Sequence, residues 1–230
     1  MLADQVFYPD YFNGAWCFCP DPVDFRAYQI VNLYQDKNAY WLEGPFSRVP
    51  RPEERRPDGT VFTTMDRAMR REQVLGSHGR STEQFGIWQA VYSPVGDDGY
   101  PKPIWDPATG VIDHQVAAYW KEHYDLSHIM QRDWQTLGPK LVGKLHITVG
   151  DMDTWYLNNA VHLLQDFLDS PANAYRVADF EYGYMKPHCY TGGGNAPGAA
   201  RTVLQRIMPQ AAQHMEKTAP PGADLSSWKY

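Results

Sequence analysis

The sequence predicts an α/β protein with about three parallel core strands, flanking helices and a long irregular segment after the first strand. Three observations predict this class. Ala15–Cys19 is a short apolar run between a glycine and a Pro-Asp-Pro turn, which is typical of a buried strand. Residues 144–185 alternate strand, helix and strand, the order of a βαβ unit in a parallel sheet. Residues 21–139 have little periodicity and are rich in proline, glycine and aromatic residues.

The first residues predict a helix without an N-cap. Leu2, Val6 and Phe7 have helical spacing, and Pro9 ends the pattern. No Ser, Thr, Asp or Asn precedes the first apolar position to accept hydrogen bonds from the free N–H groups. We therefore expect this helix to be the remainder of a longer one that begins upstream of Met1.

Residues 21–139 are expected to form an excursion within a single domain that spans residues 1–230. Val116, Tyr119 and Trp120 share one face of a helix predicted over residues 113–124. Long excursions are uncommon unless they are functional, and they often form lids or pocket walls. The arginines between Arg48 and Arg71 alternate with acidic residues and are interpreted as a solvated loop face.

The last part of the chain predicts the elements that position the candidate chemistry. A strand over residues 144–150 precedes an amphipathic helix over 156–168 and a strand over 180–185. A last helix is expected from about residue 199, interrupted near Pro209. Asp153 follows the first of these strands and His188 follows the second. Because functional groups gather at the carboxyl ends of parallel strands, we expect these two side chains to lie close together.

Composition and charge exclude several classes of protein. Hydrophobic residues make up 43% of the chain and charged residues 21%, as expected of a globular domain. The formal net charge of -6 disfavours a nucleic-acid binder. No apolar run approaches the roughly 20 residues that a membrane-spanning helix needs. The cysteines, Cys17, Cys19 and Cys189, are odd in number, so no disulfide framework is expected. Cys17 and Cys19 would point to one face of a strand, and we expect them to be buried free thiols rather than a redox pair or a metal site.

Asp153 and His188 have the chain order of the last two members of a nucleophile–acid–histidine triad. In such a triad the histidine takes the proton of the nucleophile, and the acid fixes the histidine tautomer. Other roles stay open. Asp153 can instead cap the helix that follows it, Asp151 is a rival acid, and His188 can be an ordinary surface histidine. His146 lies within a strand and is expected to be a core residue with its hydrogen bonds satisfied.

Three segments together resemble a known family. They are the Gly150–Asp153 turn, the Pro187–Tyr190 loop and the opening stretch Phe7–Gly14. They resemble the C-terminal portion of bacterial esterases related to esterase D, within the α/β hydrolases. The resemblance implies a partial α/β-hydrolase fold, hydrolysis of a small-molecule carboxylic ester, and Asp153 and His188 as the catalytic acid and base. It implies no cofactor and no metal.

The sequence departs from this family at the nucleophile. No Gly-x-Ser-x-Gly string is present, and the nearest stretch, Gly79–Glu83, lacks the second glycine. We therefore expect the serine and the oxyanion donors to lie upstream of Met1, and this chain alone to be close to inactive. The alternative is a non-catalytic, degenerate hydrolase that binds a ligand in an aromatic-rich pocket.

Two further expectations concern metals and self-association. A metal hydrolase is a third hypothesis, since potential ligands gather in one segment: His114, His123, His128, Asp113 and Asp125. The five-residue spacing from His123 to His128 does not align on one helical face, so a metal site there is disfavoured. The strand at Ala15–Cys19 is expected to lack its inner neighbour and to promote self-association through its free edge.

Overall fold

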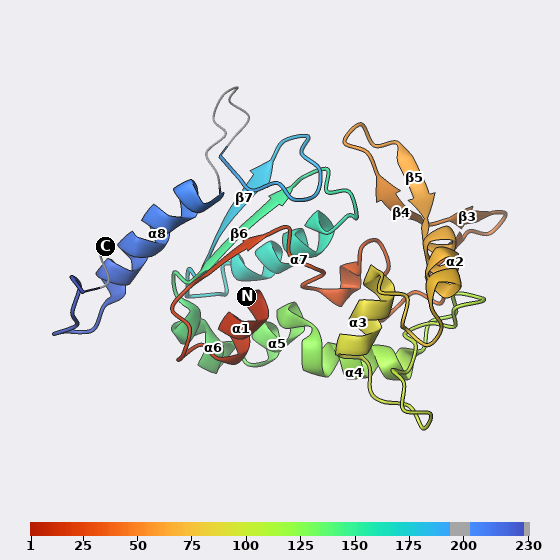
Figure 1. The fold of residues 1–230 in the computed structure, drawn as a ribbon, viewed down its shortest axis with the longest axis horizontal. Coiled ribbons are helices and arrows are strands. Elements are labelled where there is room, and N and C mark those ends of the chain that lie inside the picture. Colours follow the sequence, from red (N-terminus) through yellow and green to blue (C-terminus); the bar gives the residue numbers. More distant parts are fainter. Residues whose placement is uncertain (194–202, 228–230) are drawn as a thin grey trace.

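A parallel sheet in the order β1-β6-β7 lies at the centre of the fold, in a computed structural model that describes residues 1–193 and 203–227 (Figure 1). Its strands are β1 (Ala15–Phe18), β6 (Leu145–Gly150) and β7 (Ala178–Gly183). Ile147 of the central strand lies opposite Cys17 on one side and Phe180 on the other. The predicted α/β class and the three-stranded parallel sheet are therefore confirmed for these residues.

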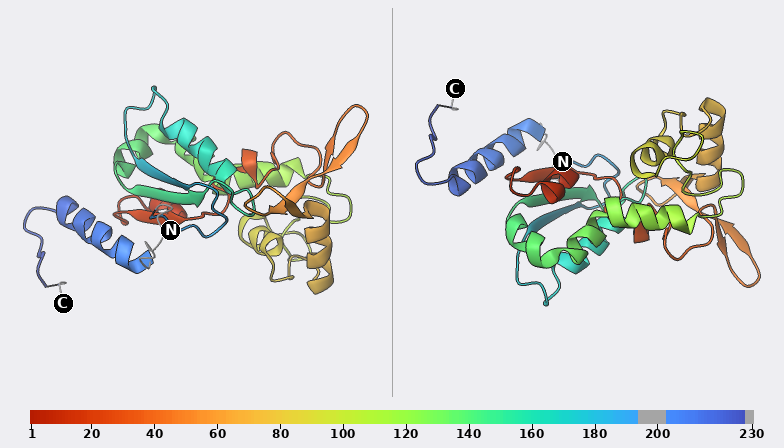
Figure 2. Two further views of the ribbon diagram at one scale, coloured as in Figure 1. Left: turned by 90° about the horizontal axis from the view of Figure 1, so that it is seen from above. Right: turned by 90° about the horizontal axis from the view of Figure 1, so that it is seen from below.

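Helices cover both faces of this sheet. On one face α1 (Leu2–Phe7), α5 (Leu126–Arg132), α6 (Trp134–Leu141) and α7 (Asn158–Leu168) share a hydrophobic cluster with β6. The other face is approached by α8 (Val203–Thr218), which lies across the sheet from α6 (Figure 2). Burial of alternate residues on β6 explains the arrangement, because Leu145, Ile147 and Val149 all enter the cluster.

Residues of the excursion build a second hydrophobic cluster, centred on Tyr28, Trp105 and Trp120. The helical elements around it are the 3-10 helix η1 (Phe25–Ala27), α2 (Met65–Leu75), α3 (Gln84–Tyr92) and α4 (His114–Tyr124). The predicted helix over 113–124 is confirmed, and Asp113 caps it by accepting from the backbone N–H groups of Gln115 and Val116.

Two hairpins in the excursion were not expected from the sequence. One joins β2 (Trp41–Glu43) to β3 (Arg48–Pro50), and the other joins β4 (Pro52–Arg55) to β5 (Val61–Thr64). The β4–β5 pairing is irregular, with register shifts on both sides of Glu54. Prolines and charged residues replace the regular apolar alternation that marks a strand, which is why the sequence pattern missed them.

Two boundaries at the C-terminal end differ from the prediction. The strand β7 begins at Ala178 and ends at Gly183, earlier than the predicted 180–185. The helix α8 continues through Pro209, so the predicted interruption is wrong, and the expected start near residue 199 lies outside the described residues. None of the helices in the described ranges combines the length and apolar character needed to cross a bilayer.

Candidate active site

Asp153 and His188 lie against each other at the carboxyl ends of β6 and β7. The imidazole Nδ1 is 2.9 Å from the carboxylate Oδ2, although the residues are 35 positions apart in the chain. An ionised carboxylate only accepts hydrogen bonds, so Nδ1 carries the proton. The Asp153 side chain is fully buried, whereas that of His188 is 23% exposed. The Nε2 atom is therefore the nitrogen left to exchange a proton with another group.

The second oxygen of Asp153 organises the turn before α7. Its Oδ1 accepts hydrogen bonds from the backbone N–H groups of Trp155 at 3.0 Å and Leu157 at 3.3 Å. The N-cap of α7 is Leu157, with no side-chain cap, so Asp153 orders the turn before the helix rather than capping it, while its other oxygen orients the histidine. With both oxygens engaged, its plane is fixed relative to the imidazole.

A close contact between backbones brings the loop that carries His188, residues 186–190, to the end of β6. We call this segment the histidine loop. A Cβ placed on Gly150 would lie 2.2 Å from the carbonyl oxygen of Lys186, so only glycine permits this approach. Met152 donates its N–H to the same carbonyl at 3.1 Å. Asp151, the rival acid, accepts a hydrogen bond from the N–H of Met185 at 2.7 Å. It therefore stabilises the loop after β7, whereas Asp153 binds the imidazole.

Arg55 of β4 links the excursion to the turn that carries Asp153. Its Nε donates to the Asp153 carbonyl oxygen at 2.9 Å, and its Nη2 donates to Asn158 Oδ1 at 3.0 Å. The guanidinium also lies 4.3 Å from the ring centre of Tyr156. Interpreting the arginine-rich segment as a solvated face was therefore wrong at this position. It was also wrong for Arg51, which is 9% exposed.

A cavity of about 380 Å³ opens beside His188. Aromatic side chains form part of its wall: Phe85, Trp88 and Trp155. The Trp155 ring meets the imidazole edge-on, with 4.8 Å between ring centres. Gln29 and Glu53 supply buried polar groups, and Gln29 Oε1 and Glu53 Oε2 have no hydrogen-bond partner among the described residues. Burial raises the pKa of Glu53 to about 7.

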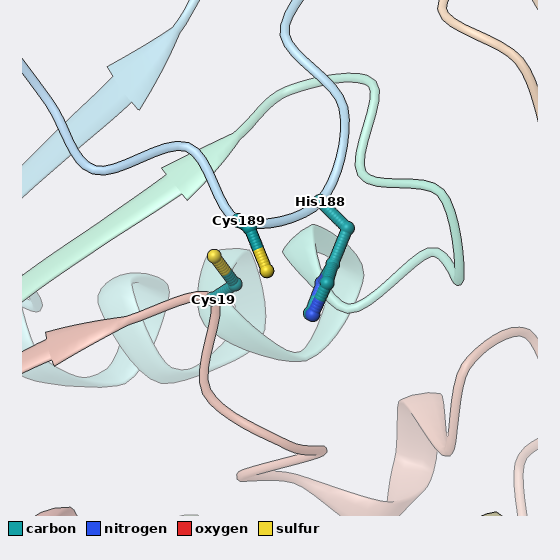
Figure 3. A group of neighbouring side chains, drawn as sticks. All are labelled: Cys19, His188 and Cys189. Carbon is teal, nitrogen blue, oxygen red and sulfur yellow. The ribbon is translucent and has the colours of Figure 1, made fainter.

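Two cysteines lie on one side of the same histidine (Figure 3). One sulfur each from Cys19 and Cys189 and one imidazole nitrogen of His188 all lie within 4.8 Å of one another. Cys19 is buried and follows β1 directly, whereas Cys189 is exposed. Cys17 and Cys19 are buried free thiols as expected, but Cys189 is a free thiol at the surface. The chain order had not indicated that β1 ends beside the histidine loop.

The histidine-rich segment expected to gather possible metal ligands is arranged otherwise. His128 Nε2 lies 3.0 Å from Glu122 Oε1, and Asp125 accepts from the Tyr34 hydroxyl at 2.5 Å. Among the described residues, the group of three or more side chains close enough to share a metal ion is the one around His188.

The nearest serine motif, Gly79–Glu83, does not form a nucleophile elbow. Ser81 is buried, and its Oγ donates to Glu72 Oε2 at 2.8 Å. Glu72 also accepts from the N–H groups of Phe85 and Gly86, at 2.9 and 2.8 Å. This serine therefore belongs to a polar network that joins α2 to α3.

His146 differs from the satisfied core residue that was expected. Its ring stacks on Trp16 with 4.6 Å between ring centres, and its Nδ1 is 3.4 Å from an Asp179 oxygen. Its Nε2 has no hydrogen-bond partner among the described residues. The ring lines a cavity of about 470 Å³ between α8 and the sheet. This cavity lies on the face of the sheet opposite the one that packs on the core cluster.

The fold and the site define a mixed α/β protein with a buried carboxylate–histidine pair beside a cavity. Comparisons of the chain with models of protein families, with curated proteins and with solved structures find no match. Inference about function therefore rests on the geometry of these side chains.

Proposed function

We propose that this chain supplies the base and the acid, His188 and Asp153, of a serine hydrolase that cleaves small carboxylic esters. In this proposal the serine and the oxyanion donors come from polypeptide that precedes Met1. The observation that carries it is the 2.9 Å contact between Nδ1 of His188 and the fully buried carboxylate of Asp153. This is the geometry that a triad requires of its last two members.

Each residue has a defined role in the proposed reaction. Asp153 keeps the proton of the neutral imidazole on Nδ1, which leaves the Nε2 lone pair free. Nε2 takes the proton of the serine hydroxyl as its oxygen attacks the ester carbonyl, and then gives it to the departing alcohol. In the second half-reaction, water loses a proton to Nε2 and releases the acyl group as a carboxylic acid.

The cavity beside His188 is suited to the part of the ester that carries polar groups. Phe85, Trp88 and Trp155 offer apolar faces, while Gln29 Oε1 and Glu53 Oε2 are buried acceptors without partners. A buried polar atom without a partner is costly, and a ligand hydroxyl group would relieve that cost. We therefore favour esters that bear hydroxyl groups over purely apolar ones.

The test is to assay aryl esters with the protein made from this chain together with its upstream reading frame. We call this protein the long form. We expect His188→Ala to lower kcat/KM by about 10⁴-fold, because the base is lost. Asp153→Asn should act in the same direction, because an amide cannot stabilise the imidazolium. His114→Ala, which changes an exposed histidine on α4, is the matched control. An inactive long form, or a His188→Ala variant with normal rates, would refute the proposal.

The cavity also supports a second candidate, a degenerate hydrolase that binds its ligand without chemistry. The same aromatic and polar side chains would then form a binding site for a hydroxyl-bearing molecule. The two candidates differ in one measurement. Binding of an ester to the long form without turnover, with His188→Ala leaving the affinity unchanged, supports the second.

A further inference from the structure

We propose that Cys19, Cys189 and His188 form a binding site for Zn²⁺, and that the bound ion removes His188 from catalysis. The binding site stands on the geometry alone, whereas the inhibitory effect rests on the proposed esterase function. Such a site would make the hydrolase switchable by the availability of a thiophilic metal.

Both sulfurs and one nitrogen of the imidazole are already close to the spacing that zinc requires. They lie within 4.8 Å of one another. Tetrahedral zinc with bonds of about 2.3 Å to sulfur and about 2.0 Å to nitrogen places two sulfurs and one nitrogen roughly 3.5 to 3.8 Å apart. Closing the remaining gap needs shifts on the order of 1 Å, and the exposed Cys189 side chain can rotate to provide them.

The donor set is one that zinc prefers. Two thiolates and one imidazole leave a fourth position open for water, as in known zinc sites with two cysteines and one histidine. Each thiol gives up its proton to solvent as its Zn–S bond forms, so binding releases two protons for each ion.

The hydrogen bond between His188 Nδ1 and Asp153 also favours metal binding by the imidazole. Nδ1 is engaged by the Asp153 carboxylate at 2.9 Å, so Nε2 is the nitrogen available as a ligand. Metal-bound histidines regularly donate their other N–H to a carboxylate, which fixes the tautomer and makes the ligand more basic. The Asp153–His188 pair thus prepares the imidazole for a metal as well as for a hydroxyl proton.

The backbone at both cysteines is unusual. Cys19 has φ +43° and Cys189 has φ +62°, a left-handed region that non-glycine residues rarely adopt. These two residues, far apart in the chain, place their sulfurs near one histidine (Figure 3). The unusual backbone conformation of Cys189 does not serve to bury its side chain, because that side chain is exposed.

Zinc and the ester reaction compete for the same atom. When Nε2 donates its lone pair to the metal, it can no longer accept the proton of the serine hydroxyl. Zinc therefore lowers the rate without displacing Asp153, and a chelator that removes the ion restores the rate.

The binding test uses residues 1–230 in reduced form and Co²⁺ as a coloured probe. We expect one Co²⁺ per chain, with the ultraviolet thiolate-to-cobalt band and the strong visible absorption of a tetrahedral site, both abolished by one equivalent of Zn²⁺. Loss of a group that hydrogen-bonds to a metal ligand weakens metal binding by roughly 10–100-fold. Cys189→Ser removes a ligand itself, so it should lower the Co²⁺ affinity by more than this. Cys17→Ala, which changes a free thiol outside the group, should keep both bands.

The outcomes separate the two halves of the proposal. Absence of the thiolate band in the reduced protein, or equal Co²⁺ affinity in Cys189→Ser, overturns the zinc site. A Cys19–Cys189 disulfide in the oxidised protein with no Co²⁺ bound after reduction also overturns it. In the long form we compare the rate with and without Zn²⁺ for each variant, and equal ratios in wild type and Cys189→Ser overturn the inhibition. Tight Co²⁺ binding by an inactive long form refutes the esterase and leaves the site standing.

Discussion

Arg55 and Asp153, 98 positions apart in the chain, are joined by a hydrogen bond of 2.9 Å from the guanidinium Nε to the carbonyl oxygen. In a second link, the backbone N–H of Arg55 donates to the Thr154 carbonyl oxygen at 2.8 Å. The excursion thus fixes the backbone of the turn whose side chain orients His188. A segment with little sequence periodicity therefore contributes to the geometry of the candidate site.

Arg55→Ala should destabilise the protein and loosen the histidine pair. The change leaves the Asp153 carbonyl and the Asn158 side-chain oxygen without a charged donor, at a cost of about 1–3 kcal/mol. Urea unfolding measures the loss. Arg56→Ala is the matched control, because the Arg56 guanidinium lies over the ring of the exposed Phe62, 5.7 Å away. Equal destabilisation by the two variants would contradict the bracing role of Arg55.

Gly150→Ala should separate His188 from Asp153. The added methyl would lie 2.2 Å from the Lys186 carbonyl oxygen and 2.5 Å from that of Pro187, so the loop backbone must move. We expect destabilisation of about 1–3 kcal/mol and a changed resonance for the proton on His188 Nδ1 in NMR spectra. Gly44→Ala is the control, since its φ lies outside the left-handed region and an added Cβ would meet only Ser47, at an ordinary contact distance of 3.4 Å. An unshifted Nδ1 proton would show that the close approach is unimportant.

The free side of β1 should promote self-association. Among the described residues β1 pairs with β6 alone, and Ala15 and Cys19 direct their N–H groups toward it. The intervening Trp16 and Phe18 present theirs to the open edge, a template for another strand. Sedimentation analysis should show association that rises with concentration and that Phe18→Lys reduces. A monomer over the whole concentration range would contradict this prediction.

The sequence predicted the parts of the site that follow local rules. The apolar strands and the amphipathic helix between them have clear periods, so the positions of Asp153 and His188 at the strand ends could be inferred. Arg55, Cys19 and the buried Glu53 could not, because their roles depend on contacts between segments far apart in the chain. Aromatic packing, not a repeating pattern, shapes the excursion that positions Arg55 and Glu53.

Glu53→Gln should remove a pH-dependent loss of stability. Burial raises the pKa of Glu53 from its ordinary 4.5 to about 7 in the folded protein. Below pH 4.5 the carboxyl is protonated in the folded and unfolded states alike, so it contributes no difference. Between pH 4.5 and 7 the unfolded chain ionises first, and the free energy of unfolding falls by about 3 kcal/mol in total. Above pH 7 both states are ionised and the loss is constant.

The free energy of unfolding, measured by urea titration from pH 4 to 8, gives the test. The wild type should lose stability relative to Glu53→Gln as the pH rises to about 7, and the gap should then stay level. Glu43→Gln, which removes an exposed carboxylate on β2, is the control for the change in net charge. If the gap between wild type and Glu53→Gln is independent of pH, the Glu53 carboxyl ionises normally in the folded protein. The cavity beside His188 would then contain a permanent negative charge and disfavour acidic esters.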